Sequence, residues 1–201
     1  MSCLLLIFWL TSAPLPEEAD SSVQTNLKVY QSLGRGIGDS VAQTIARLDS
    51  PRVAVTVAPA EFRWFLDGPV ADAFRVRGWK VVAPDSARYL AEFGALAMHV
   101  AYANVRRPGL FSARVVDRTV RMSVSIRLTD KSTGGLLLAA ERAGEFADTV
   151  ELSGIEVLET PWVPATRGTL PPEGFLSGWA EPLIVIGSIA VAIYLLFTVR
   201  S

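Results

Sequence analysis

Hydrophobic positions divide this chain into two apolar runs at its ends, helix-like spacing in its first half and alternation in its second. Residues 182–199 (PLIVIGSIAVAIYLLFTV) contain no charged side chain. A helix of this length would cover about 27 Å, close to the thickness of a bilayer's hydrocarbon core. The run therefore predicts a single transmembrane helix over 182–199.

The residues around this run predict its orientation and contacts. Arg200 follows it directly, whereas Trp179 precedes it. Arginine favours the cytoplasmic side and tryptophan the membrane interface, so the main body is expected outside the cytoplasm. Ser188 and Ala192 are small residues four positions apart, a spacing that permits close packing against another helix. The predicted anchor and interface residues are Trp179, Pro182, Gly187, Ser188, Ala192, Tyr194 and Arg200.

The apolar run at the amino terminus, Leu4–Leu10, has the length of a signal-peptide core and is followed by small residues. No Lys or Arg precedes it and Pro14 follows the small residues, so an uncleaved first helix remains an alternative. We predict a signal peptide over 1–13. Cys3 is the only cysteine, so cleavage would leave neither a disulfide nor a cysteine nucleophile.

Apolar residues at helical spacing predict a leading helix over 26–48, which lays one face on the core. The glycines of 34–39 (GRGIGD) interrupt it and could separate two helices. This stretch lacks the spacing and the preceding strand of a phosphate-binding loop. The other expected elements of this half are a strand over 52–58, a helix over 60–77 that contains Pro69, a strand over 79–83 and a helix over 85–94.

The second half is dominated by alternation. Over 114–129, even-numbered positions from Val120 to Leu128 are apolar and odd-numbered ones from Arg121 to Thr129 are polar, as in a half-buried strand. Strands are also expected over 97–106 and 136–145, and the turn residues of 130–135 (DKSTGG) predict an antiparallel hairpin. After Gly154 the prolines and glycines favour a semi-extended stalk.

These elements predict one domain of the α/β (α+β) class. Their order is α-β-α-β-α-β-β-β, and the rules of connection give a single mixed sheet with helices packed on it, followed by the transmembrane helix. The expected organisation is a signal peptide over 1–13, a linker over 14–26, a periplasmic domain over 27–153, a stalk over 154–181, the transmembrane helix over 182–199 and a cytoplasmic end over 200–201.

Several segments resemble a family of bacterial envelope domains. They are the leading helix, VAVTVAP (53–59) with its following helix, GWKVVAPDSARYL (78–90), and SIRLTDKSTGGLLLAAE (125–141). Over about 27–150 the pattern is similar to the TolB amino-terminal domain, the penicillin-binding-protein activator LpoB and the curli secretion lipoprotein CsgG. The resemblance implies a non-enzymatic domain that docks, activates or assembles other envelope components. This chain differs from that family in its predicted carboxy-terminal anchor.

Candidate chemistry is sparse. His99 is the only histidine, lies in a predicted strand and has no nucleophile motif near it, so we assign no catalytic, cofactor-binding or metal-binding residues. Acidic pairs such as Asp67 and Asp72 could bind a cation, but solvated charge is the commoner explanation. The net charge of −1 implies no strong electrostatic attraction to nucleic acid or anionic lipid. Basic residues of the hairpin form a candidate partner-binding face: Arg118, Arg121 and Arg127.

The leading functional hypothesis is a single-pass protein of the bacterial inner membrane. It would present a non-catalytic interaction or assembly module to the periplasm, with the lipid bilayer and an envelope protein as partners. One alternative is an accessory subunit of a larger inner-membrane complex. The other is an envelope hydrolase or small-ligand-binding enzyme that uses acidic residues. The sequence identifies neither the partner nor the oligomeric state.

Overall fold

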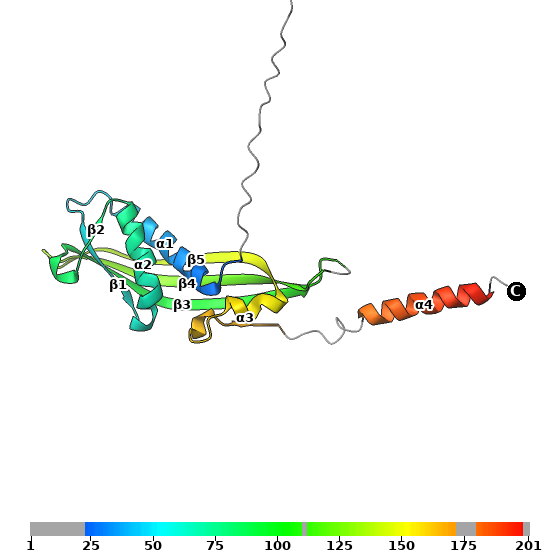
Figure 1. Ribbon diagram of the computed structural model, residues 1–201. Helices are drawn as coiled ribbons and strands as arrows, with labels where there is room; N and C mark the ends of the chain where they lie inside the picture. Colours follow the sequence, from blue (N-terminus) through cyan, green and yellow to red (C-terminus); the bar gives the residue numbers. More distant parts are fainter. Residues whose placement is uncertain (1–22, 110–111, 172–179, 199–201) are drawn as a thin grey trace, which may run out of the picture.

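The computed structural model describes residues 23–109, 112–171 and 180–198, and the side chains of its last helix over 185–196. The chain forms a six-stranded mixed sheet in the order β2-β1-β3-β4-β5, with β6 also paired to β3. Helices α1 and α2 lie side by side on one face of this sheet (Figure 1). A mixed sheet with helices packed on it is the arrangement that the sequence predicted.

The element bounds are α1 Asn26–Thr44, β1 Arg52–Ala58, α2 Arg63–Val76, β2 Lys80–Val81, β3 Tyr89–Arg106, β4 Val115–Asp130, β5 Gly135–Glu151, α3 Ile155–Leu158, β6 Gly168–Thr169 and α4 Ala180–Thr198. Strand β1 runs parallel to β2 and β3, whereas β3, β4 and β5 form a long antiparallel meander. The meander extends well beyond β1, so three strands make up most of the sheet.

Helix α1 is continuous through its glycines because two of them face α2. A Cβ at Gly38 would lie 3.1 Å from the Cβ of Ala73 and 3.2 Å from the carbonyl oxygen of Val70. A Cβ at Gly34 would lie 3.1 Å from Leu66. The glycines therefore allow close approach of the two helices, and this packing outweighs their low helix propensity. Thr25 caps the first turn by accepting a hydrogen bond from the Lys28 amide.

The helix expected over 85–94 is wrong. A short 3-10 turn, Pro84–Ser86, is followed at Tyr89 by β3. The apolar residues Tyr89, Ala91 and Phe93 also alternate, and all three are buried. Pairing with β1 on one side and β4 on the other gives this segment two strand neighbours, and these long-range pairs decide its structure.

The expected transmembrane helix over 182–199 is contradicted. In the part of the chain that the structure describes, no helix is long and apolar enough to cross a membrane. The predicted fold class is therefore corrected to the mixed-sheet domain without that helix. The predicted signal peptide over 1–13 lies outside the described residues.

The segment after β5, expected to be an extended stalk, begins by packing on the domain. Ile155 and Leu158 of α3 are buried, and so are Val163 and Thr166. Strand β6 then pairs in parallel with β3, where Gly168 lies opposite Val100. Residues 155–169 thus belong to the folded unit.

Candidate docking surface

The three arginines predicted as one partner-binding face lie on opposite sides of the sheet. All three belong to β4. Side chains alternate between the faces of a strand, so even-numbered Arg118 points the same way as the apolar even positions, towards the helices. Its side chain is 0% exposed, whereas that of Arg121 is 64% exposed. Arg127 is also exposed and shares the face of Arg121.

Arg118 is held by a buried polar cluster. Its Nε and Nη2 donate to the two carboxylate oxygens of Asp148, at 2.8 and 2.6 Å. Its Nη1 donates to Asn26 Oδ1 at 2.8 Å and to the carbonyl oxygen of Gln24 at 2.7 Å. Asn26 in turn donates to the hydroxyl of Tyr102 at 3.0 Å. This arginine therefore fixes the start of α1 onto the meander and is not available to a partner.

The opposite side of the meander forms the surface that we call the open face. It consists of the side chains of β3, β4 and β5 that point away from α1 and α2, and helices cover the other side (Figure 1). Strand register places them in rows across the three strands. The central rows are Ala97–Ser123–Ala143, His99–Arg121–Glu145, Ala101–Thr119–Ala147, Gly94–Ser125–Glu141 and Glu92–Arg127–Ala139.

The open face is unusual because its side chains are small. Most of the central rows consist of alanine, serine, glycine and threonine. Alanine and glycine are depleted in strands because they pack poorly against cross-strand neighbours. On a face that served only folding, larger β-branched or aromatic side chains would stabilise the sheet better. Small residues instead leave a flat surface that another backbone can approach closely.

A shallow hollow of about 450 Å³ marks the middle of this face. Across it, Arg121 donates from Nε and Nη2 to the carboxylate of Glu145, at 3.0 and 3.3 Å. Arg127 has no ion-pair or hydrogen-bond partner among the described residues and so offers a cation to a bound molecule. The hollow is lined by Ala97, His99, Arg121, Met122, Ser123, Ala143, Gly144 and Glu145.

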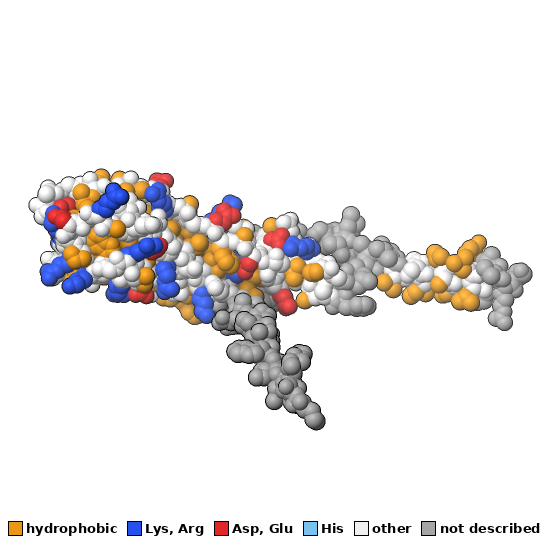
Figure 2. Space-filling view, turned by 90° about the horizontal axis from the view of Figure 1, so that it is seen from above, with side chains coloured by type: hydrophobic (Ala, Val, Ile, Leu, Met, Phe, Trp, Pro, Cys, Tyr) orange, Lys and Arg blue, Asp and Glu red, His pale blue; other side chains and the backbone are white. Residues whose placement is uncertain are grey.

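The helix side of the domain presents a different surface. In the view from above Figure 1, hydrophobic, basic and acidic side chains are interspersed over the folded domain (Figure 2). Several of its charges are already paired: Arg77 makes two hydrogen bonds to Asp39, and Arg75 makes one to Asp72. This side therefore lacks the flat, uniform character of the open face.

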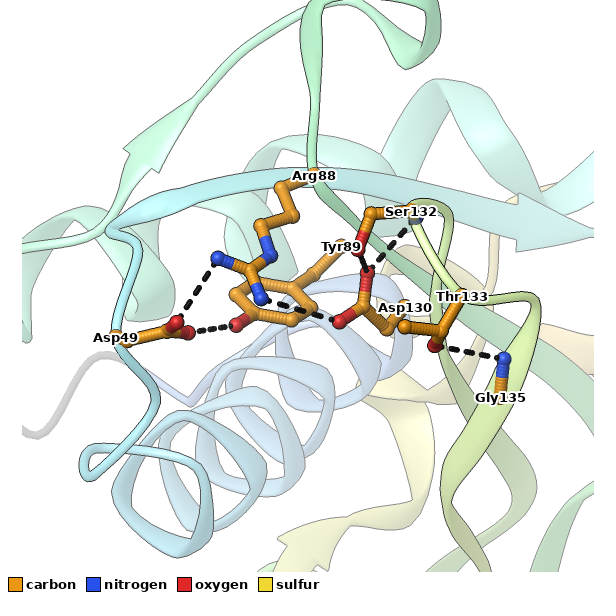
Figure 3. A network of polar contacts seen from close by, with 7 residues as sticks. All are labelled: Asp49, Arg88, Tyr89, Asp130, Ser132, Thr133 and Gly135. Carbon is orange, nitrogen blue, oxygen red and sulfur yellow. Dashed lines mark hydrogen bonds and ion pairs between the residues drawn. The ribbon is translucent and has the colours of Figure 1, made fainter.

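Acidic residues, which an enzyme would use as acid and base, are mainly tied to arginines or hydrogen-bond donors. Figure 3 shows one such network, where the β4–β5 turn meets the start of β3. Tyr89 donates to Asp49 at 2.5 Å, and Arg88 reaches both Asp49 and Asp130. The bond from Tyr89 lowers the pKa of Asp49, and the hydroxyl of Ser132 lowers that of Asp130. The network fastens the turn to the domain.

Asp67 differs from the carboxylates of this network. Its pKa is raised by partial burial, against the opposing effect of Arg63. Both residues belong to α2, and Arg63 donates from Nε to the carbonyl oxygen of Val57 at 2.8 Å. The amide of Val57 lies close enough to Asp67 to counter part of the pKa rise. Arg63 and Asp67 thus interact with the carbonyl oxygen and the amide of Val57, in the part of β1 that extends past the end of β2. This structural role explains the position of the two side chains.

The remaining candidates show no constellation of reactive groups. His99 is exposed on the open face beside Arg121. Within residues 23–109, 112–171 and 180–198, no group of three or more His, Cys, Asp or Glu side chains could hold a metal ion. Among the described residues, the structure therefore offers a surface for binding.

Residues predicted as membrane anchor and interface fall on or beyond α4. Trp179 and Arg200 lie outside the described residues, and Pro182 lies in α4 without a described side chain. Tyr194 is 67% exposed, and the hydroxyl of Ser188 donates to the carbonyl oxygen of Val185 at 2.8 Å. Gly187 and Ala192 are also exposed on α4. No contact between α4 and another helix is seen among the described residues.

Comparisons with known proteins provide no family for this chain. No protein-family model matches it, and no curated protein sequence matches it. Among solved structures it is similar to the PelC dodecamer from Paraburkholderia phytofirmans, with 19% sequence identity over 51% of this chain and 71% of that chain, and a TM-score of 0.24. A likeness this weak supports no conclusion about this chain. It does not bear on the resemblance to envelope domains, which stays a prediction.

Proposed function

We propose that this protein is a non-catalytic interaction or assembly module of the bacterial cell envelope, and that it docks a partner protein on the open face. The observation that carries the proposal is the run of small side chains across β3, β4 and β5. These residues are poor choices for sheet stability and good choices for close approach of another backbone. The export signal predicted over 1–13 supports placing the module in the envelope.

The size of the open face suits a specific interface. Strand β4 has 16 residues, so at about 3.4 Å per residue the face is about 54 Å long. Three strands about 4.8 Å apart give it a width of about 14 Å. The resulting area of about 750 Å² is close to the roughly 800 Å² that each partner contributes to a standard protein–protein interface.

The chemistry of the face defines the partner. A flat segment with small or aliphatic side chains fits the alanine and serine rows, and an acidic side chain fits Arg127. A second acidic group of the partner could replace Glu145 in the ion pair with Arg121, because an exposed ion pair of this kind contributes little to stability. The expected partner is therefore a protein segment, helical or extended, that carries carboxylates along an otherwise small-residue surface.

The test starts with a photo-crosslinking amino acid placed in living cells at Ser123 on the open face or at Arg35 on α1. We expect a defined protein adduct from position 123 only. The captured protein is then identified and purified, and its affinity is measured for the intact chain, for Ala97→Arg and for the helix-side control Gln43→Arg. Weaker binding by Ala97→Arg alone supports the proposal. Adducts from position 35 only, or equal binding by both variants, would overturn it.

A further inference from the structure

Among the described residues, strand β5 forms a long sheet edge with no strand neighbour on its outer side. It runs from Gly135 to Glu151 and pairs on one side with β4. Among the described residues no strand pairs with its other side, because β5 ends the strand order. Such an edge presents unpaired amide and carbonyl groups to other chains, and proteins usually protect it with proline, lysine, bulges or a covering element. Strand β5 contains neither proline nor lysine.

The start of β5 is also apolar and exposed. Leu136 is 52% exposed and Leu137 is 46% exposed. Further along the strand lie four acidic residues and one arginine: Glu141, Arg142, Glu145, Asp148 and Glu151. These charges restrict which chain can pair with the edge and in which register.

A second copy of this chain satisfies that restriction. In a two-fold antiparallel pairing of two β5 strands, opposite side chains must lie on the same face of the sheet. The symmetry axis therefore passes midway between the two copies of one residue, which we call the centre of the register. Six such registers are centred on residues 141 to 146. Five of them place like charges directly opposite: Glu141–Glu141, Arg142–Arg142, Glu141–Glu145, Glu145–Glu145 or Glu141–Glu151 for centres 141, 142, 143, 145 and 146.

The register centred on Gly144 avoids every like-charge pair. It sets Arg142 opposite Phe146, a cation beside an aromatic ring, and Leu138 opposite Val150. Residues 138–150 of both strands would pair over roughly 44 Å, which supplies a long ladder of main-chain hydrogen bonds. Ala147 faces Glu141 in this register, so each copy places a neutral side chain beside a carboxylate.

Helix α1 leaves room for this pairing. Leu33 of α1 lies over Gly144, where a Cβ would be 3.1 Å from it. Residues two positions apart lie about 200° around a helix, so Ser32 and Gly36 face away from α2, which contacts Gly34. Both are exposed, and a Cβ at Gly36 would meet nothing within 4 Å. Two α1 helices could therefore lie next to each other across the joined strands.

We infer that two copies of this chain join through their β5 edges, in the register centred on Gly144, to form one continuous sheet. The open faces of both copies then lie on the same side of that sheet, free to bind partners. The pairing uses the main chain of the β5 edge, whereas a docked partner would contact side chains across β3, β4 and β5, so either can fail without the other.

Charge variants at Ala147 test the inference. Its side chain points away from the core and lies opposite Thr119 within its own chain, so Ala147→Glu and Ala147→Lys alter the domain equally little. In the dimer, Glu at 147 would face Glu141 of the other copy and Lys would complement it. By sedimentation equilibrium of the full-length chain, we expect about a tenfold weaker dimer for Ala147→Glu and about a tenfold tighter one for Ala147→Lys. The open-face control Ala97→Glu should leave dimerisation unchanged.

A cross-linking experiment fixes the register. In a Cys3→Ser background, Glu141→Cys and Ala147→Cys chains are prepared separately and treated with a short thiol cross-linker. Each alone should stay uncross-linked, because like positions lie far apart, and an equal mixture should give the covalent dimer. A chain that is monomeric at every concentration would overturn the inference. So would a dimer that responds equally to both charges at 147, that Ala97→Glu dissociates, or that cross-links with one variant alone.

Discussion

Arg118 and Arg121 are three residues apart on β4 and therefore on opposite faces of the sheet, in different chemical environments. The side chain of Arg118 is 0% exposed and meets the carboxylate of Asp148, whereas that of Arg121 is 64% exposed and meets Glu145. Each pairs with an acidic residue of β5 through two nitrogens. The comparison shows that similar pair geometry serves folding on one face of the sheet and leaves a side chain available for binding on the other.

Removing the buried arginine should give the largest effect on stability. In Arg118→Met, Asp148 and Asn26 lose their shared donor, and Asn26 lies in the core with 0% exposure. Breaking one partner out of a buried ion pair costs about 3 kcal/mol or more because the other polar groups stay without partners. Urea unfolding followed by circular dichroism should therefore show a loss of about 3 kcal/mol.

The matched variant on the other face is Arg121→Met. An exposed ion pair contributes about 0–1 kcal/mol to stability. The unfolding free energy of Arg121→Met should therefore differ from that of the intact chain by no more than about 1 kcal/mol. Equal losses for the two variants would contradict the distinction between the faces, as would a stable Arg118→Met chain.

The two sides of α1 offer the same contrast on a smaller scale. Gly38→Ala adds a methyl group 3.1 to 3.3 Å from Ala73 and from the backbone of Val70, which cannot move without separating the helices. Overpacking of this kind costs about 1–3 kcal/mol. Gly36→Ala meets open space and should gain about 1 kcal/mol from helix propensity. Thermal melts of the two variants should shift in opposite directions, and a stabilised Gly38→Ala chain would show that the helices are less closely packed than described.

Acid should loosen the turn network before it affects the apolar core. Hydrogen bonds from Tyr89 and Ser132 lower the pKa values of Asp49 and Asp130 below their ordinary value. A carboxyl whose pKa is lower in the folded state stabilises the fold above its unfolded value of about 3.9, and this contribution is lost as the pH falls through the lower folded value. Stability should therefore fall with pH below about 4.

An arginine variant separates this network from the general effect of acid. Arg88→Gln removes the cation that reaches both carboxylates, so stability should depend less steeply on pH below about 4. Arg127→Gln removes a cation that has no ion-pair partner among the described residues and should leave the steepness unchanged. Unfolding by urea at a series of acidic pH values measures both. If the unfolding free energy depended on pH equally steeply in both variants, the network of Asp49, Arg88 and Asp130 would not contribute to the pH dependence.

Sequence periodicity predicts the parts of the fold that depend on local pattern. The bounds expected for the strand over 52–58 agree with β1, and the alternation over 114–129 agrees with β4. The alternation also places even-numbered Arg118 on the face opposite to odd-numbered Arg121 and Arg127, so it contradicts the prediction that the three form one face. Periodicity failed where long-range pairing decides, as at Tyr89, and where several distant residues meet, as in the cluster of Arg118, Asn26 and Asp148.

The candidate surface could be predicted only in part. Small residues in the alternating strands are visible in the sequence, but the rows they form depend on the register between strands and on a bulge near Leu96. The packing of 155–169 was also missed, because its prolines and glycines indicate extended chain, whereas burial of Ile155 and Leu158 depends on contacts far away in the sequence.

The smallest predicted effect bears most directly on why the open face has small residues. Ala97 lies opposite Ser123, and no strand pairs with its other side among the described residues. Threonine fits a strand better than alanine, so Ala97→Thr should stabilise the isolated chain by about 0.5 kcal/mol and still weaken partner binding by adding a branched side chain to a flat surface. The core control Ala91→Thr, at a position with 0% exposure, should destabilise the fold because it buries a hydroxyl. If Ala97→Thr gained stability with partner affinity unchanged, small size at this position would have no role in docking.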